Sequence, residues 1–222
     1  MSESSKMKAE RLGEVYAILE ARYPDARLRL DFRTPLDLLV ASILAARCRD
    51  EVVNRTTASL FADYRTAKDY ADADVETLEA ELGSLPMFRR KARSIKAACE
   101  SLVAEHGGKV PADVGALTAL KGVGRKTANL VLSNAFGQPA IVVDTHVLRI
   151  CERLDLSSGT DRDRTERELM RMLPENRWSH LAHIFSDFGR ETCKAQNPRC
   201  ALCPVAKLCP YIKKRRGVAI ET

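Results

Sequence analysis

The chain has 222 residues, of which 45% are hydrophobic, enough to bury one large core or two modest ones. This composition excludes a disordered protein, and the chain has no apolar run long enough for a signal peptide or a membrane span. Thirty-six Lys and Arg residues against 30 Asp and Glu give a net charge of +6, which suits a polyanionic partner without proving one. We therefore expect a cytoplasmic protein with no membrane partner, associated with the nucleoid if its partner is DNA.

The first periodic stretch lies close to the N-terminus. Its apolar residues recur with helical spacing, at Leu12, Val15, Tyr16 and Leu19. Residues 26–32 alternate between apolar and polar like a strand, but no second strand is available to pair with them. We predict a helix followed by an extended linker.

Helix starts are marked along the rest of the chain. At residues 34–37 a threonine, a proline and an acid precede an apolar run, which is typical of a capped helix start. Similar starts occur at Asp50 and Asp113. Helical spacing returns near the middle of the chain, at Val147, Leu148, Cys151 and Leu154. Nearly every periodic stretch predicts a helix, so the expected fold class is all-α.

A glycine-rich turn connects two of these helices. It lies in the sequence LKGVGRKTAN at residues 120–129. Gly122 and Gly124 let the backbone turn sharply, and the next helix start offers unpaired N–H groups, so the turn suits a phosphate. An ordinary connection between helices is the simpler interpretation of a bare Gly-x-Gly, and both remain open on these residues alone.

Two ionisable residues follow the turn. Lys126 lies in the first turn of the second helix, where the helix dipole and neighbouring Lys121 and Arg125 are expected to lower its pKa. A lysine acts as a nucleophile only as the free amine. Eighteen residues later, an apolar run leads to Asp144 at the start of another helix. The commoner role of such an aspartate is the helix N-cap, and a capping carboxylate can still face a ligand.

Seven cysteines, an odd number in a chain with no export signal, argue against a disulfide framework. Cys48, Cys99 and Cys151 are scattered among apolar residues and are predicted to be inert core thiols. The other four have the spacing C-x6-C-x2-C-x5-C, at Cys193, Cys200, Cys203 and Cys209. Ligand type alone suits either a tetrahedral zinc, which it favours, or a cubane iron–sulfur cluster.

The sequence LKGVGRKTANLVLSNAFG, followed by VDTH, resembles the helix-hairpin-helix signature of the endonuclease III DNA glycosylases. The similarity extends from about Leu28 to Pro210. It implies a bifunctional DNA glycosylase and AP lyase of base excision repair, which excises oxidised pyrimidines and cleaves the strand by β-elimination through a lysine Schiff base. The expected partner is double-stranded DNA with damaged bases or abasic sites, and the expected state is a monomer.

The resemblance also assigns roles to residues. Lys126 is the implied nucleophile and Asp144 its catalytic partner, with Thr145 and His146 beside it in the substrate pocket. The cysteine spacing, which includes NPRC at residues 197–200, is similar to the cluster loop of the family and implies a 4Fe-4S cluster. The implied DNA contacts come from the hairpin and from basic residues of the cysteine loop: Lys121, Gly122, Val123, Gly124, Arg125, Lys194 and Arg199. The basic run at residues 213–216 is either a further contact or a solvated tail.

The family architecture implies two helical domains with a DNA-binding cleft between them. One is a six-helix domain with the helix-hairpin-helix, expected at residues 29–138. The other is an iron–sulfur domain, expected at residues 1–28 plus 139–222.

Two segments depart from the family pattern. At residues 45–50 the chain reads AARCRD where S-A-Q-x-T-D is usual, so that Arg47 replaces the glutamine that fills the gap left by the flipped base. Asp50, which matches, is expected to lie at the substrate pocket. At residues 85–92 a proline, which stiffens the loop, replaces the usual glycine, and Met87 is the candidate wedge into the duplex.

Two alternatives belong to different classes. The adenine glycosylase of the same superfamily shares the hairpin and the cluster, but it usually lacks the lysine and has an additional C-terminal domain. The second alternative is a catalytically silent DNA-damage-binding paralogue. It would keep the fold and the phosphate contacts without the chemistry, and the presence of Lys126 and Asp144 argues against it.

Overall fold

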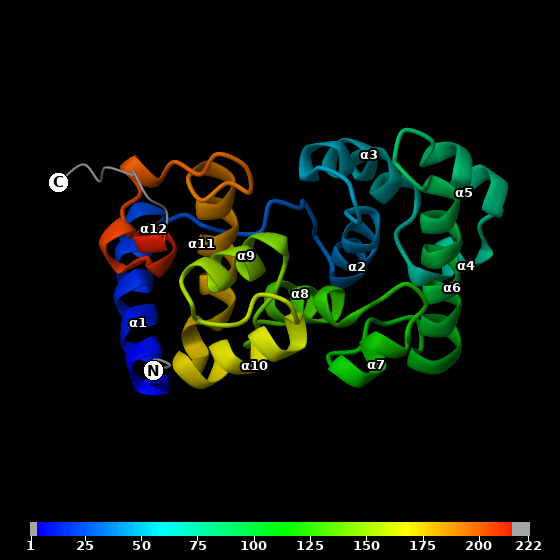
Figure 1. Ribbon diagram of the computed structural model, residues 1–222. Helices are drawn as coiled ribbons and strands as arrows, with labels where there is room; N and C mark the ends of the chain where they lie inside the picture. The colour runs from blue at the N-terminus through cyan, green and yellow to red at the C-terminus, as the bar shows by residue number, and fades with distance from the viewer. Residues whose placement is uncertain (1–3, 215–222) are drawn as a thin grey trace. The chain divides into compact units, whose positions relative to one another are not determined.

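The computed structural model describes residues 4–214, without the side chains of residues 213 and 214. These residues form α-helices, short 3-10 helices and connecting loops and contain no strand, which confirms the predicted all-α class (Figure 1). Arg215 and Arg216 of the basic run lie outside the described residues. None of the described helices is long and apolar enough to cross a membrane.

The chain divides into two compact units. The hairpin unit comprises Leu28–Gln138, and the cysteine unit joins the residues up to Arg27 to those from Pro139 onward. The sequence placed the first of these boundaries one residue later, at 29. Each unit has its own cluster of buried apolar side chains.

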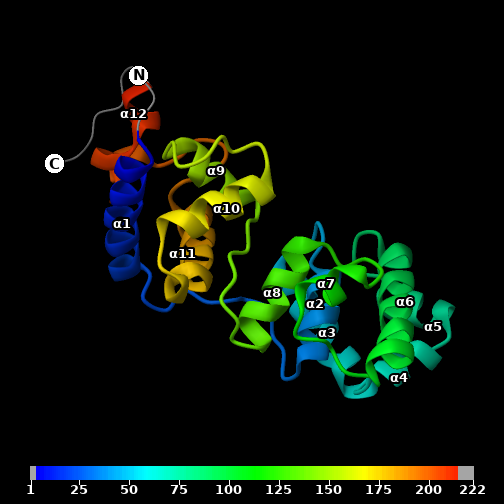
Figure 2. The same cartoon turned by 90° about the horizontal axis from the view of Figure 1, so that it is seen from below.

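The hairpin unit contains seven α-helices, one more than the resemblance implies: α2 (Pro35–Leu44), α3 (Asp50–Asp63), α4 (Ala67–Asp72), α5 (Val75–Glu81), α6 (Phe88–His106), α7 (Val114–Ala119) and α8 (Arg125–Ala135) (Figure 2). The short helices α4 and α5 are separate because each has its own cap. Thr66 forms a capping box at the start of α4, and the Asp74 carboxylate accepts a hydrogen bond from the backbone N–H of Thr77 at the start of α5.

Helix α2 is the centre of the hairpin unit. Nine of its ten residues are buried, and it packs against α3, α6 and α8. The predicted capped start is confirmed, because the Thr34 hydroxyl accepts from the N–H of Asp37 at 3.1 Å and the Asp37 carboxylate accepts from the N–H of Thr34 at 3.2 Å. Pro35 occupies the first helical turn. This buried helix therefore positions both α3, which follows it in the chain, and α8, which packs against it.

The cysteine unit contains five α-helices and three 3-10 helices in the described part of the chain: α1 (Ser5–Arg22), α9 (Thr145–Arg153), α10 (Arg162–Met172), η1 (Glu175–Arg177), α11 (Trp178–Glu191), η2 (Cys200–Leu202), η3 (Ala206–Leu208) and α12 (Pro210–Lys214). Helix α11 packs against both α1 and α9 and buries Ile184, Phe185 and Phe188. The four apolar residues of α1 that the sequence singled out are all buried, which confirms that helix.

The remaining expectations for local structure have mixed outcomes. Residues 26–32 form no strand, as predicted. Asp113 is the N-cap of α7, and its carboxylate accepts from the N–H of Ala116 at 2.8 Å. Helix α3 does begin at Asp50, but Arg49 occupies the cap position and makes no side-chain capping bond. Asp50 is therefore the first helical residue and not a cap.

Candidate active site and metal centre

The hairpin turn joins α7 to α8 through Leu120 and Gly124. Gly122 has a φ of +81°, a left-handed conformation that favours glycine. The backbone N–H of Val123 donates to the carbonyl of Leu120 at 3.1 Å, and the Val123 side chain is only 6% exposed. Of the predicted DNA contacts in the turn, Val123 can therefore contribute only its backbone, because its side chain belongs to the hydrophobic core.

Lys126 is the second residue of α8, and its side chain is exposed. It forms no hydrogen bond or ion pair with any described residue. The neighbouring side chains of Lys121 and Arg125 are exposed as well. The turn thus presents several cations and the start of a helix on one stretch of surface, an arrangement that suits an anionic ligand.

Side-chain capping distinguishes the helices of the hairpin unit. Helices α2, α4, α5 and α7 each have a side chain that accepts a hydrogen bond from the first turn. Helices α3, α6 and α8 have none. These three begin at the segments that the sequence singled out for DNA contact, near Arg47, at Met87 and at Gly124. The first-turn N–H groups of these three helices have no side-chain cap, a feature that the other four helices of the unit do not share.

Arg47 and Met87, which lie in the two segments that depart from the family pattern, share an unusual backbone. Arg47 has a φ of 55° and Met87 a φ of 58°, two of the four non-glycine residues with positive φ in the described part of the chain. Both side chains are exposed, with Met87 at 40%. Such a conformation costs about 1–3 kcal/mol for a non-glycine residue and persists where the surroundings impose it, often at ligand sites. Asp50, expected at the pocket, is half-buried at the start of α3.

One buried cation in the hairpin unit was not predicted. Lys91, on the first turn of α6, is only 3% exposed, and its Nζ has no hydrogen-bond partner. Burial lowers the pKa of Lys91, an effect that the nearby thiol of Cys48 opposes. Sequence patterns gave no sign of this burial, because a lysine that follows Arg89 and Arg90 and precedes Arg93 suggests an exposed face.

In the cysteine unit, Asp144 is the N-cap of α9. One carboxylate oxygen accepts from the N–H groups of His146 and Val147, each at 2.8 Å, and the other accepts from the Ser186 hydroxyl at 3.1 Å. The predicted capping role is confirmed. A carboxylate has about four acceptor positions, so one remains for a ligand.

His146 is half-buried beside this cap, whereas Thr145 is exposed. Burial lowers the pKa of His146, and nearby Asp144 opposes that effect. A Cβ on Gly189 of α11 would lie 2.7 Å from the His146 ring, so only glycine allows α11 to approach this closely.

The guanidinium of Arg149 lies 3.1 Å from His146 Nδ1, and its Nε donates to the carbonyl of Cys193 at 3.0 Å. Arg149, which the sequence did not single out, thus connects the start of α9 to the cysteine loop.

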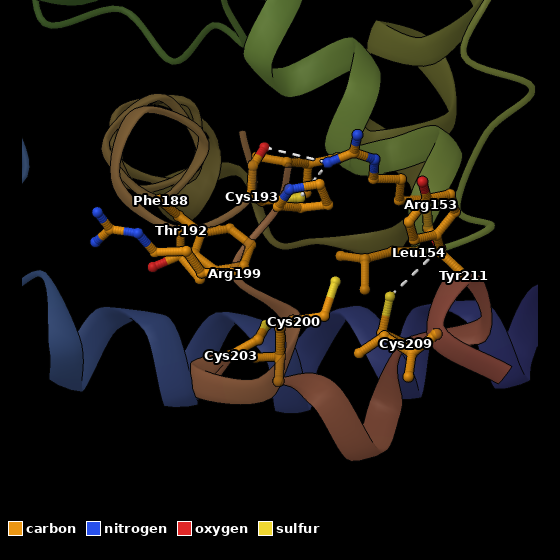
Figure 3. Close-up of a pocket in the computed structure, with 14 residues that line it drawn as sticks. Arg153, Leu154, Phe188, Thr192, Cys193, Arg199, Cys200, Cys203, Cys209 and Tyr211 are labelled. Carbon is orange, nitrogen blue, oxygen red and sulfur yellow. Dashed lines mark hydrogen bonds between the residues drawn. The ribbon is translucent and has the colours of Figure 1, made fainter. Parts of the chain in front are cut away.

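The four closely spaced cysteines line one cavity together with apolar side chains (Figure 3). No group of three or more His, Cys, Asp or Glu residues among those described is arranged to hold a single metal ion. Thiolates on one tetrahedral zinc lie roughly 3.8 Å apart, whereas the corners of a cubane cluster hold them farther apart. Burial raises the pKa of Cys203 to about 12 and also raises that of Cys209. The thiols fit a cluster that fills the cavity and stabilises their thiolate forms.

The cysteine loop is held from α9 by Arg153. Its guanidinium donates to Cys193 Sγ at 3.2 Å, to the carbonyl of Lys194 at 2.7 Å and to the carbonyl of Ala195 at 3.0 Å, and it lies 4.9 Å from the centre of the Tyr211 ring. These contacts keep Lys194 half-buried. Arg199 also lines the cavity, although its side chain is exposed overall.

The three scattered cysteines differ from one another. Cys99 and Cys151 are buried, and burial raises the pKa of both, that of Cys99 to about 12, as expected for inert core thiols. Cys48 is half-buried in the loop after α2 and packs against the edge of the hydrophobic core, so it is less enclosed than the other two.

Comparison with known proteins identifies related sequences. Residues 40–175 match the family model described as HhH-GPD superfamily base excision DNA repair protein, and residues 193–209 match the iron-sulfur binding domain of endonuclease III. The chain is 44% identical over 204 residues to endonuclease III of Synechocystis sp., covering 91% of this chain and 93% of that protein. It is 43% identical over 194 residues to endonuclease III of Bacillus subtilis, covering 87% and 89% of the two chains.

Two solved structures that resemble this chain are complexes with DNA. A trapped endonuclease III–DNA covalent intermediate matches with a TM-score of 0.90 and 42% identity, covering 93% of this chain and 98% of that one. A non-covalent endonuclease III–DNA complex matches with a TM-score of 0.89, also at 42% identity, covering 93% and 97%. The matched regions contain the hairpin and the cysteine loop.

Proposed function

The chain belongs to the endonuclease III family of the HhH-GPD superfamily, and from this premise we propose that Lys126 and Asp144 perform its chemistry. The protein is a DNA glycosylase and AP lyase of base excision repair that binds DNA and carries a 4Fe-4S cluster. The proposed substrates are oxidised pyrimidines and abasic sites in duplex DNA, acted on by a monomer in the cytoplasm at the nucleoid. The observation that carries this proposal is the exposed, unpartnered Lys126 at the uncapped start of α8.

DNA binding in this proposal begins with the phosphate backbone. The N–H groups at the start of α8 and the side chain of Arg125 hold a phosphate, which sets the register of the strand without reading its sequence. The damaged nucleotide turns out of the duplex, because its C1′ is otherwise inaccessible to a side chain. Arg47 and Met87, on their strained loops, fill the space that the nucleotide leaves.

Base removal places positive charge on the deoxyribose. A carboxylate close to the sugar stabilises that charge, and we assign this role to Asp144. The capping bonds from the N–H groups of His146 and Val147 hold the carboxylate in one orientation.

Strand cleavage uses the amine of Lys126. The free Nζ forms a bond to C1′ as the C1′–N bond to the base breaks and the base leaves with a proton. Opening of the sugar ring gives a Schiff base between Nζ and C1′. Loss of a C2′ proton then expels the 3′ phosphate by β-elimination, and water releases the sugar fragment and restores the amine.

Cys193, Cys200, Cys203 and Cys209 would hold the 4Fe-4S cluster, and the metal–sulfur bonds would fix the loop. All four ligands come from the protein, so no open position is left for substrate. Lys194 and Arg199 lie on this loop and are proposed to contact phosphates from it.

The proposal is tested with purified protein on duplexes that contain thymine glycol, a simple abasic site, or adenine opposite 8-oxoguanine. The expected result is release of thymine glycol and a nick on the 3′ side, with both products lost in Lys126→Ala. Release of adenine alone would instead support the adenine glycosylase. Binding of damaged duplex with neither product would support the silent binder.

A further inference from the structure

A basic groove lies between α6 and the hairpin turn, within the hairpin unit. Its lining combines side chains from the first turns of α6 with the turn itself: Arg89, Arg90, Arg93, Ser94, Lys121 and Gly122. Four of these six residues are cationic, and none is acidic. The α6 residues were not among the predicted DNA contacts.

Gly122 brings the turn against α6. A Cβ at this position would lie 2.8 Å from Ser94 Cβ and 2.9 Å from Ser94 Oγ, distances that side chains do not tolerate. Its φ of +81° also favours glycine. The close approach to Ser94 and the left-handed backbone both require glycine at position 122, so the turn packs directly against Ser94. Lys121 consequently lies beside the arginines of α6.

The charges in the groove are unequally neutralised. Glu79, whose side chain is only 14% exposed, lies 3.2 Å from Arg93 Nε and 3.6 Å from Arg89 Nε. Arg90 and Lys121 form no ion pair with any described residue. Glu79 therefore fixes the two outer arginines, and the two remaining cations are available to an external anion.

We propose that this groove is a second phosphate-binding site, in which Arg90, Ser94 and Lys121 contact a backbone phosphodiester of DNA. The inference rests on the DNA binding of the proposed function, and it adds a binding site to the one at the start of α8. A DNA strand is the occupant because the groove is continuous with the turn that precedes α8, so one strand reaches both sites. The planar guanidinium of Arg90 donates to the two non-bridging oxygens of the phosphodiester, and the Ser94 hydroxyl donates to one of the same two oxygens.

The test is the salt dependence of DNA binding. Each phosphate contact contributes about 0.9 to the slope of log K against log salt concentration. Arg90→Ala should lower this slope by about 0.9 and weaken binding about tenfold at low salt, since a hydrogen bond to a charged group is lost. The loss should be equal on undamaged duplex and on duplex with a tetrahydrofuran abasic-site analogue, because a phosphate is the same in both.

Two further variants serve as controls. Arg171→Ala, on the exposed surface of α10 in the cysteine unit, removes the same charge and should leave slope and affinity unchanged. Arg90→Lys should restore the slope but only part of the affinity, because an ammonium does not reproduce the bidentate contact. An Arg90→Ala protein with the wild-type slope would overturn the proposal, as would a loss confined to the abasic duplex.

The result is independent of the catalytic proposal. The salt slopes are measured on undamaged duplex and on the tetrahydrofuran analogue, which cannot form a Schiff base, so they do not depend on cleavage. If the wild type does not cleave DNA, the proposed activity is wrong. The salt slopes of the wild type and Arg90→Ala would still show whether the groove binds a phosphate.

Discussion

In the hairpin unit, Lys126 lies on the surface and has no partner among the described residues, whereas in the cysteine unit Asp144 caps a helix and accepts three hydrogen bonds. The four clustered cysteines, like Asp144, are part of the local structure. Their loop contains only short 3-10 helices, and hydrogen bonds from Arg149 and Arg153 hold it in place. A substitution of Lys126 therefore tests chemistry alone. In the cysteine unit, one substitution changes both chemistry and structure, and the variants must separate the two.

The largest expected effect is loss of the cluster. Cys203→Ser should remove the cluster absorbance and lower the free energy of unfolding of the cysteine unit by more than about 4 kcal/mol, since a metal site that fixes a whole loop is lost. The hairpin unit has its own core and should keep its amide protection. Hydrogen exchange followed by mass spectrometry measures both units in one experiment.

The matched control is Cys151→Ser, which makes the same replacement in the same unit but in the α9 core, outside the cavity. It should keep the cluster. The contrast between units would be wrong if both variants lost the cluster, or if Cys203→Ser also exposed the amides of the hairpin unit.

The next effect separates the two roles of Asp144. Asp144→Asn keeps a good N-cap but removes the charge, whereas Asp144→Ala removes both. Both variants should reduce base release about 10²–10³-fold, the usual loss when one electrostatic contact to the transition state is removed. Only the alanine variant should also lose about 1 kcal/mol of stability. Single-turnover base release and urea unfolding give the two numbers, and near-wild-type release by Asp144→Asn would exclude a role for the charge.

The smallest effect concerns Lys91, the one group of the hairpin unit in which a buried charge lacks a partner. Lys91→Met should raise the free energy of unfolding at pH 7 by about 1–2 kcal/mol, because an unsatisfied buried cation is replaced by a flexible apolar chain. Burial lowers the pKa of Lys91 in the folded protein below the ordinary lysine value of 10.5, so at pH values between the folded and the ordinary pKa the unfolded chain binds more protons.

The stability of the wild type should consequently rise with pH in that window, below pH 10.5, and the Lys91→Met protein should lack this rise. Urea unfolding at about pH 7 and about pH 9.5 measures the difference. Lys109→Met, at an exposed position, should change neither the stability nor its pH dependence. Equal slopes in the wild type and Lys91→Met would show that Lys91 has a partner in solution.

Local signals predicted much of the fold. The capping box at Thr34 and Asp37 and the cap at Asp113 are short-range patterns, and both are present in the structure. The hairpin could be predicted because a glycine is required at Gly122. Asp144 could be placed at a helix start because the apolar run before it ends there.

Other features depend on contacts between distant parts of the chain. Arg153 donates a hydrogen bond to Cys193, which lies 40 residues later in the chain. The spacing of apolar residues in the sequence does not predict a contact over that separation. The left-handed backbone at Arg47 and Met87 was not predictable because glycine and asparagine, the usual signals for that conformation, are absent there. Lys91 is buried by packing that a pattern of charged neighbours conceals.

The measurement that tests the central claim most directly is borohydride trapping on duplex DNA with an abasic site, followed by peptide mapping of the adduct. Borohydride reduces the Schiff base to a stable amine, so the adduct marks the attacking residue. The wild type and Lys121→Ala, a neighbouring lysine on the same turn, should both give an adduct on Lys126 at saturating protein. Lys126→Ala should bind the duplex, unfold at the wild-type temperature and give no adduct. An adduct formed by Lys126→Ala at the wild-type yield would contradict the assignment of Lys126 as the nucleophile.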